Sequence, residues 1–203
     1  MIKKLFLGIG IVFIAFIGIT MCLYNKEVSR VQQNPKQAHT DGIMKDGNIT
    51  ALHHASWNGD YGKVSQLLQQ GHDIHSKTVV YKFTPFHMAI FKGHTKVADL
   101  LLSKGANIDE GSNFNQTPLQ WAAFIGEVDS ADFLIKEGAD LEKLSDQGWT
   151  ALHYASTMGN LGVVKLLIQK GAKADKKTGD GQTAKELAKS NKREEVVQFL
   201  NSL

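Results

Sequence analysis

The hexapeptide TALHYA, Thr150 to Ala155, has four related copies elsewhere in the sequence. They are TALHHA from Thr50, TPFHMA from Thr84, TPLQWA from Thr117 and TAKELA from Thr183. The starting points of the five copies are therefore 34, 33, 33 and 33 residues apart. A constant period of this length indicates a chain built from stacked structural repeats.

Each copy predicts the start of a short helix that is followed by a second one. The threonine can accept hydrogen bonds from the free N–H groups of the first turn, and Pro85 and Pro118 occupy the first helical position, where no N–H is needed. A glycine then ends the first helix, and an apolar-periodic segment such as VVKLLIQKG follows. The first-helix glycines are Gly59, Gly93, Gly126 and Gly159, and those after the second helix are Gly71, Gly105, Gly138 and Gly171.

The hexapeptides, together with linkers such as ANIDEG and ADLEKL, resemble the ankyrin repeat, with its T-P-L-H-x-A and G-A-D-x-N-type motifs. The resemblance covers residues 45–203 and implies an all-α ankyrin repeat solenoid of about five helix-turn-helix repeats. The expected repeats are approximately 45–78, 79–111, 112–144, 145–177 and 178–203. An N-terminal hydrophobic signal or anchor helix is expected to precede them.

Some positions depart from the family pattern. One extra residue near Val79 predicts a longer or differently shaped finger, and Gln120 and Glu186 replace the hexapeptide histidine. Lys192 stands where the other repeats have a helix-ending glycine, and the polar run KELAKSNKREE suits the capping repeat that a solenoid needs at its end. Nine basic and three acidic residues lie between Lys165 and Arg193, which we interpret as a solvated cap, the alternative being a contact for an acidic partner.

The N-terminal 30 residues have the layout of an export signal. Two lysines precede 19 uncharged, mostly apolar residues from Leu5 to Leu23, long enough to cross a bilayer. No A-x-A cleavage motif follows, and Met21 is too bulky for the residue before a lipoprotein cysteine, so we favour an uncleaved signal-anchor over a signal peptide at 1–30. With 31–44 as a linker, the repeats are expected outside the cytoplasm, in the periplasm, either anchored to the inner membrane or exported after cleavage.

Charge and cysteine content add two expectations. The net charge is +3, but from Val31 onward there are 19 basic and 19 acidic residues, which argues against nucleic-acid binding because that needs a basic surface. The only cysteine is Cys22, so the repeats cannot form an internal disulfide.

The histidines do not predict catalysis. His53, His87 and His153 recur at one repeat position, and the family resemblance implies structural hydrogen bonds for them. His72 and His75 are spaced as possible metal ligands, but no third or fourth ligand stands at a metal-site spacing. No phosphate-binding loop or nucleophile elbow is present, so we expect no enzyme, no cofactor and no metal.

The resemblance implies recognition through the fingertips and the concave side of the first helices. Seven of the 20 matching positions in the first four repeats are aromatic, while aromatic residues make up 8% of the chain. Large exposed aromatic side chains are typical of protein-binding hot spots. The predicted contact residues are Trp57, Tyr81, Phe83, Phe91, Phe114, Phe124, Trp149 and Met158. Some of these rings are expected to pack on neighbouring fingers instead, and Trp121 and Tyr154 are assigned to the core.

These features predict a non-enzymatic, monomeric protein–protein interaction module with an unidentified protein partner, attached to the membrane through Leu5 to Leu23. The resemblance extends to small exported ankyrin proteins of bacteria, which implies an immunity protein that inhibits a toxin or an accessory protein of an envelope enzyme. Two alternatives are a self-associating structural protein of the envelope and a secreted effector that acts on host proteins.

Overall fold

The computed structural model describes residues 47–203, and Gly47–Leu203 form one compact unit. The predicted apolar segment Leu5–Leu23 and the linker 31–44 lie outside the described residues. Within the described part, no helix is both long and apolar enough to cross a membrane.

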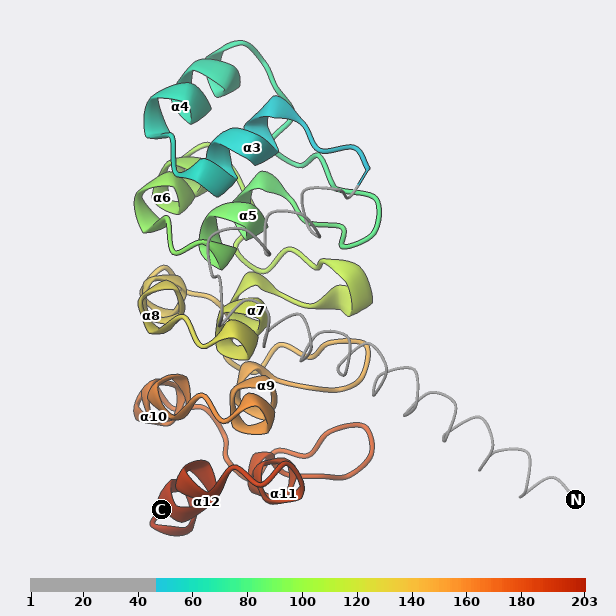
Figure 1. Cartoon of the computed structure of the whole chain (residues 1–203), viewed down its shortest axis with the longest axis vertical. Coiled ribbons are helices and arrows are strands. Elements are labelled where there is room, and N and C mark those ends of the chain that lie inside the picture. Colours follow the sequence, from blue (N-terminus) through green and yellow to red (C-terminus); the bar gives the residue numbers. More distant parts are fainter. Residues whose placement is uncertain (1–46) are drawn as a thin grey trace, which may run out of the picture. The chain divides into compact units, whose positions relative to one another are not determined.

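Residues 47–203 form ten α-helices and one 3-10 turn, and this part of the chain contains no strand. The helices come in consecutive pairs that stack one above the other (Figure 1). The first helices of the pairs form one column, the second helices form another, and the loops between pairs project to one side as fingers (Figure 1). The first helices are α3 (Ala51–Asn58), α5 (Pro85–Phe91), α7 (Pro118–Ile125), α9 (Ala151–Met158) and α11 (Ala184–Ser190). The second helices are α4 (Tyr61–Gln69), α6 (Thr95–Ser103), α8 (Val128–Lys136), α10 (Leu161–Gln169) and α12 (Glu194–Asn201), and η1 (Asn113–Asn115) lies in the third finger.

Each first helix begins at the hexapeptide threonine, as the sequence predicts. The threonine side chain accepts from the backbone N–H three residues later, and the side chain at that later position accepts from the threonine N–H, which forms a capping box. Histidine, glutamine and glutamate all serve in this role, at His53, Gln120 and Glu186 for example. The replacements of the family histidine therefore preserve the helix start.

The ends of the first helices explain why glycine recurs there. Gly59, Gly126 and Gly159 adopt left-handed backbone conformations, with φ between 71° and 86°. A side chain on Gly159 would also collide with Arg193 of the following repeat. Lys192 adopts the same left-handed conformation with φ 56°, so the last repeat keeps the shape of this turn without glycine.

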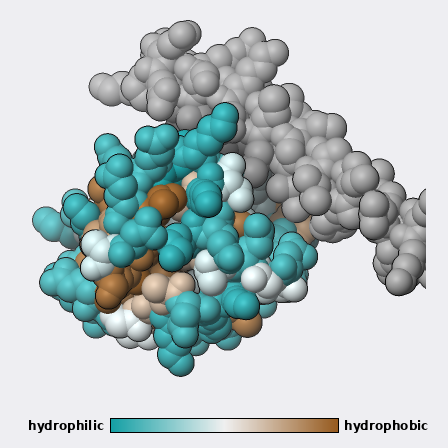
Figure 2. All heavy atoms as spheres, turned by 90° about the horizontal axis from the view of Figure 1, so that it is seen from below, coloured by the Kyte–Doolittle hydropathy of each residue, from teal (hydrophilic) through white to brown (hydrophobic). Residues whose placement is uncertain are grey.

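The two end faces of the stack carry polar side chains. His54 is exposed on α3, while Met88, Tyr154 and Leu187 at the same repeat position are buried and Trp121 is half-buried. At the C-terminal end, Figure 2 shows a mostly hydrophilic surface around a smaller apolar area. A polar first and last repeat suits a stack that ends at these two faces.

Candidate protein-binding surface

Eight aromatic side chains from the first four repeats form one continuous row, here called the aromatic row. Trp57 stacks on Phe91 with ring centroids 5.8 Å apart, and Phe83 lies 5.0 Å from Trp121 in an edge-to-face arrangement. The row continues from Trp121 to Phe124 at 5.7 Å and from Phe124 to Tyr154 at 6.3 Å. Its members are Trp57, Tyr81, Phe83, Phe91, Trp121, Phe124, Trp149 and Tyr154.

Two of the predicted contact residues are buried in this row, and their assignment to an exposed surface is wrong. Trp57 is 3% exposed because Phe91 covers one part of the ring and the Lys92 ammonium lies 5.0 Å from its centroid. Phe83 is 1% exposed because the rings of Tyr81, His87 and Trp121 surround it. Both side chains therefore pack inside the stack.

Two residues assigned to the core belong to the same row. Tyr154 is buried, as predicted, and its hydroxyl accepts from Gln116 Nε2 at 2.8 Å and donates to Gln147 Oε1 at 3.1 Å. Burial raises the pKa of the Tyr154 hydroxyl above its ordinary value. Trp121 is only half-buried, and its ring joins the second repeat to Phe124. Trp121 and Tyr154 stand at the fifth hexapeptide position, where the other repeats have His54, Met88 and Leu187. Their large aromatic side chains were the sequence signal that the row continues through these positions.

All five fingertips share a left-handed backbone position that the hexapeptide motif does not predict. The residue two positions before each hexapeptide threonine has positive φ in all five repeats; these residues are Asn48, Lys82, Asn115, Gly148 and Gly181. In the third finger the preceding residue, Phe114, also has positive φ, at 57°. None of the other four fingers has this second left-handed residue. For a bulky side chain this conformation is rare and is held only by the surrounding structure.

Phe114 combines this strained backbone with an exposed ring. Its side chain is 50% exposed, and Val79 in the neighbouring finger is 54% exposed. The two fingers are joined by a hydrogen bond from Asn113 N–H to the Tyr81 carbonyl at 2.8 Å, and the Phe114 carbonyl accepts from Asp146 N–H of the next finger at 3.0 Å. The backbone on both sides of Phe114 is thus fixed while its ring faces solvent.

The remaining predicted contact residues are partly exposed. Tyr81, Phe91, Phe124 and Trp149 are half-buried members of the aromatic row. Met158 lies outside the row and lines a hollow of about 220 Å³ with Gly159, Arg193 and Glu194 at the start of α12. The structure therefore brings six of the eight predicted residues into the aromatic row and leaves Phe114 and Met158 beside it.

Polar side chains in the finger bases connect repeats to one another. His53 Nε2 lies 2.9 Å from the Phe83 carbonyl, and His153 Nε2 lies 3.0 Å from the Lys176 carbonyl, which fits the structural role implied for these histidines. His72 and His75 are exposed, and Asp73 between them accepts from the His75 N–H at 2.8 Å. Among residues 47–203, no group of three or more histidine, cysteine or acidic side chains could hold a metal ion.

Comparison with known proteins identifies the family. A family model described as ankyrin repeats (3 copies) matches residues 52–145 and 133–202, which together cover well over half of the chain. A search of curated proteins finds no match. Ankyrin repeats are generally modules that bind protein partners. With its five threonine-capped helix pairs and this match, the chain belongs to the ankyrin repeat family.

Proposed function

We propose that this chain is a non-enzymatic binding protein that captures a protein partner on the fingertips of its second, third and fourth repeats and on the exposed edge of the aromatic row. The observation that supports this most strongly is Phe114, a half-exposed phenylalanine with left-handed backbone. Backbone strain of this kind is concentrated at ligand-contacting positions, because there it serves function instead of stability.

The neighbours of Phe114 supply the rest of the proposed contact. Val79 and Phe114 present apolar side chains on adjacent fingertips, and Trp149 presents a half-buried ring on the fourth finger. Rings that are already packed against one another lose little conformational freedom when a partner binds. Exposed apolar groups beside rigid aromatic ones are the composition expected of a binding hot spot.

We further propose that the partner lies outside the cytoplasm. The support for this is the uncharged run from Leu5 to Leu23 after two lysines. An inhibitor of a toxin or an accessory protein of an envelope enzyme would fit a module held in this position. N-terminal sequencing of the chain recovered from cells would separate an uncleaved anchor from a cleaved signal.

The direct experiment is capture from native envelope extract with residues 31–203, using wild type and Phe114→Gly in parallel. We expect a protein that is retained by the wild type and lost with Phe114→Gly, because glycine fits the left-handed position and removes only the ring. A protein retained equally by both chains would show that the third fingertip is not part of its binding site.

The exposed pair Val79 and Phe114 also supports a second candidate, self-association through the fingertips. Analytical ultracentrifugation of residues 31–203 distinguishes the two functions. A monomer over the concentration range favours capture of another protein. A dimer that dissociates when Phe114 is replaced by glycine favours self-association.

A further inference from the structure

Consecutive repeats are joined by two recurring side-chain hydrogen bonds, and one junction lacks both of them. The first runs from the third residue after the hexapeptide threonine to a carbonyl at the base of the next finger. The second starts at the residue that follows the glycine, or Lys192 in the last repeat, at the end of the first helix. It runs back to a carbonyl near the C-terminal end of the first helix in the preceding repeat. The two are called here the finger bond and the helix-end bond.

The finger bond is absent between the second and third repeats. His53 and His153 each place Nε2 within 3.0 Å of a carbonyl of the next finger, and Gln120 Nε2 donates to the Trp149 carbonyl at 3.0 Å. His87 occupies the same position and its buried Nε2 forms no hydrogen bond of regular geometry, although the Gln116 backbone, the acceptor expected from the other repeats, lies close to the ring. Because Nδ1 of His87 accepts from Thr84 N–H at 3.3 Å, Nε2 carries the proton, so a buried donor lacks a well-aligned acceptor.

The helix-end bond is also absent there. His94 Nε2 lies 3.0 Å from the Trp57 carbonyl, Asn160 Nδ2 donates to the Ala123 carbonyl at 2.8 Å, and Arg193 Nε donates to the Thr157 carbonyl at 3.0 Å. The equivalent residue between the second and third repeats is Glu127, which as a carboxylate has no proton to donate. Its Oε2 lies beside Gly93 at the end of α5, where the helix dipole is negative and a second negative charge is unfavourable.

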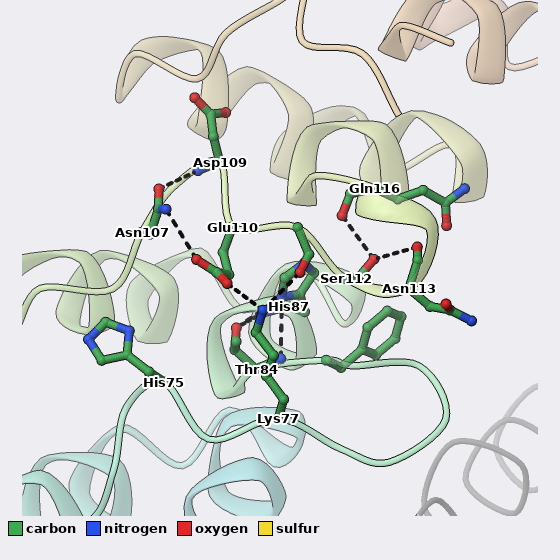
Figure 3. Close-up of polar contacts among 12 residues, drawn as sticks. His75, Lys77, Thr84, His87, Asn107, Asp109, Glu110, Ser112, Asn113 and Gln116 are labelled. Atoms are coloured by element: carbon green, nitrogen blue, oxygen red, sulfur yellow. Dashed lines mark hydrogen bonds and ion pairs between the residues drawn. The ribbon is translucent and has the colours of Figure 1, made fainter. Parts of the chain in front are cut away.

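The contacts that remain at this junction are of other kinds. Ser130 Oγ donates to the Ile90 carbonyl at 3.0 Å, and Lys77 pairs with Glu110 and donates to the Gly111 carbonyl at 3.1 Å. Figure 3 shows Lys77, Glu110 and His87 gathered at the base of the third finger. The ion pair is partly exposed, so solvent screens it. The rings of Phe83 and Trp121 complete the contact across the junction.

We propose that the repeat domain divides at the junction between the second and third repeats, with α3–α6 unfolding as one unit while α7–α12 stay folded. In a linear stack each repeat contacts only its neighbours, so the stack divides where the neighbour interaction is weakest. Three junctions have both recurring bonds, and this one has neither. The division does not depend on the identity of a partner, although Phe83 and Trp121 of the aromatic row lie on its two sides.

Hydrogen exchange of the full-length chain in mild detergent, followed by mass spectrometry under weakly denaturing conditions, tests the proposal. Peptides from α3–α6 should exchange together in one step, at lower denaturant than peptides from α7–α12. A single step shared by all five repeats, or a boundary at another junction, would overturn the proposal.

Glu127→Asn tests the cause, because Asn160 shows that asparagine at this position can donate to the preceding helix end. We expect this variant to lower the exchange of α3–α6 by about five- to tenfold, the effect of one added hydrogen bond. Glu137→Asn, on an exposed residue at the end of α8, is the matched control and should leave the exchange of α3–α6 unchanged. Equal exchange in wild type and Glu127→Asn would contradict the proposal.

Discussion

The aromatic row and the third fingertip both contain phenylalanine, yet the rings lie in opposite environments. Phe83 in the row is 1% exposed and packs against four other rings, whereas Phe114 on the fingertip is 50% exposed and has a strained backbone. Burial of a ring stabilises the stack, while exposure with strain does not. Two phenylalanines of neighbouring fingers, one and three residues before the hexapeptide threonine, therefore lie in different environments, one inside the stack and one in solvent.

The largest effect should come from removing a ring of the aromatic row. Phe83→Ala removes a fully buried ring that joins the second finger to the third repeat, and we expect it to lower the free energy of unfolding by about 3–5 kcal/mol. Phe114→Ala should lower it by less than about 1 kcal/mol, because half of this ring already faces water. Urea denaturation of residues 31–203 measures both, and equal losses would remove the distinction between the two regions.

Acid should destabilise the aromatic row through His87, the histidine that stacks on Phe83. Burial lowers the pKa of His87 from 6.5 to about 4, although the Gln116 backbone and the Glu110 charge act in the opposite direction. Between these values the unfolded chain binds a proton at His87 that the folded chain does not, so stability falls as the pH falls from 6.5 to 4, by at most about 3 kcal/mol. His153 has a lowered pKa and adds in the same direction.

His87→Gln should remove the part of this acid dependence that belongs to His87, since glutamine forms the capping box at Gln120 and does not titrate. Denaturation midpoints measured at several pH values would check this. His54→Gln, on an exposed histidine of α3, is the matched control and should keep the wild-type slope. An unchanged slope in His87→Gln would contradict the assignment.

Replacing Phe114 at the fingertip with glycine should change the free energy of unfolding by less than Phe83→Ala does, and in the opposite direction. Phe114→Gly relieves a left-handed phenylalanine, and we expect it to raise the free energy of unfolding by about 1 kcal/mol. Asn115→Gly, at the neighbouring left-handed position, should give a smaller gain because asparagine tolerates this conformation. Thermal unfolding of both variants provides the measurement, and destabilisation by Phe114→Gly would show that the ring holds the finger together.

The boundaries of the first helices could be predicted from the sequence, because local side-chain chemistry determines them. The hexapeptide threonines, the prolines after two of them and the glycines nine residues later specify where the first helices begin and end. Burial of individual rings was less predictable, because the coverage of Trp57 depends on Phe91 and Lys92 from the next repeat. The left-handed backbone at Phe114 was not predictable, since the residues NFN do not require it and the bonds to neighbouring fingers hold it.

The difference between the junctions of the repeats could also be predicted only in part. Glu127 could be read from the sequence as the odd residue among His94, Asn160 and Arg193, but only the structure shows that all three of those side chains donate to the preceding helix. The lack of a well-aligned acceptor for Nε2 of His87 likewise depends on the course of the third finger, which starts from the same hexapeptide chemistry as the others.

The most direct test of the account is the binding affinity of a captured partner for the wild type and for Phe114→Gly, measured beside the stability of each chain. We expect binding weakened at least about tenfold, the loss of one hot-spot side chain, with stability equal to or above that of the wild type. Unchanged affinity in a chain that still folds would contradict the proposal that the third fingertip is a recognition surface.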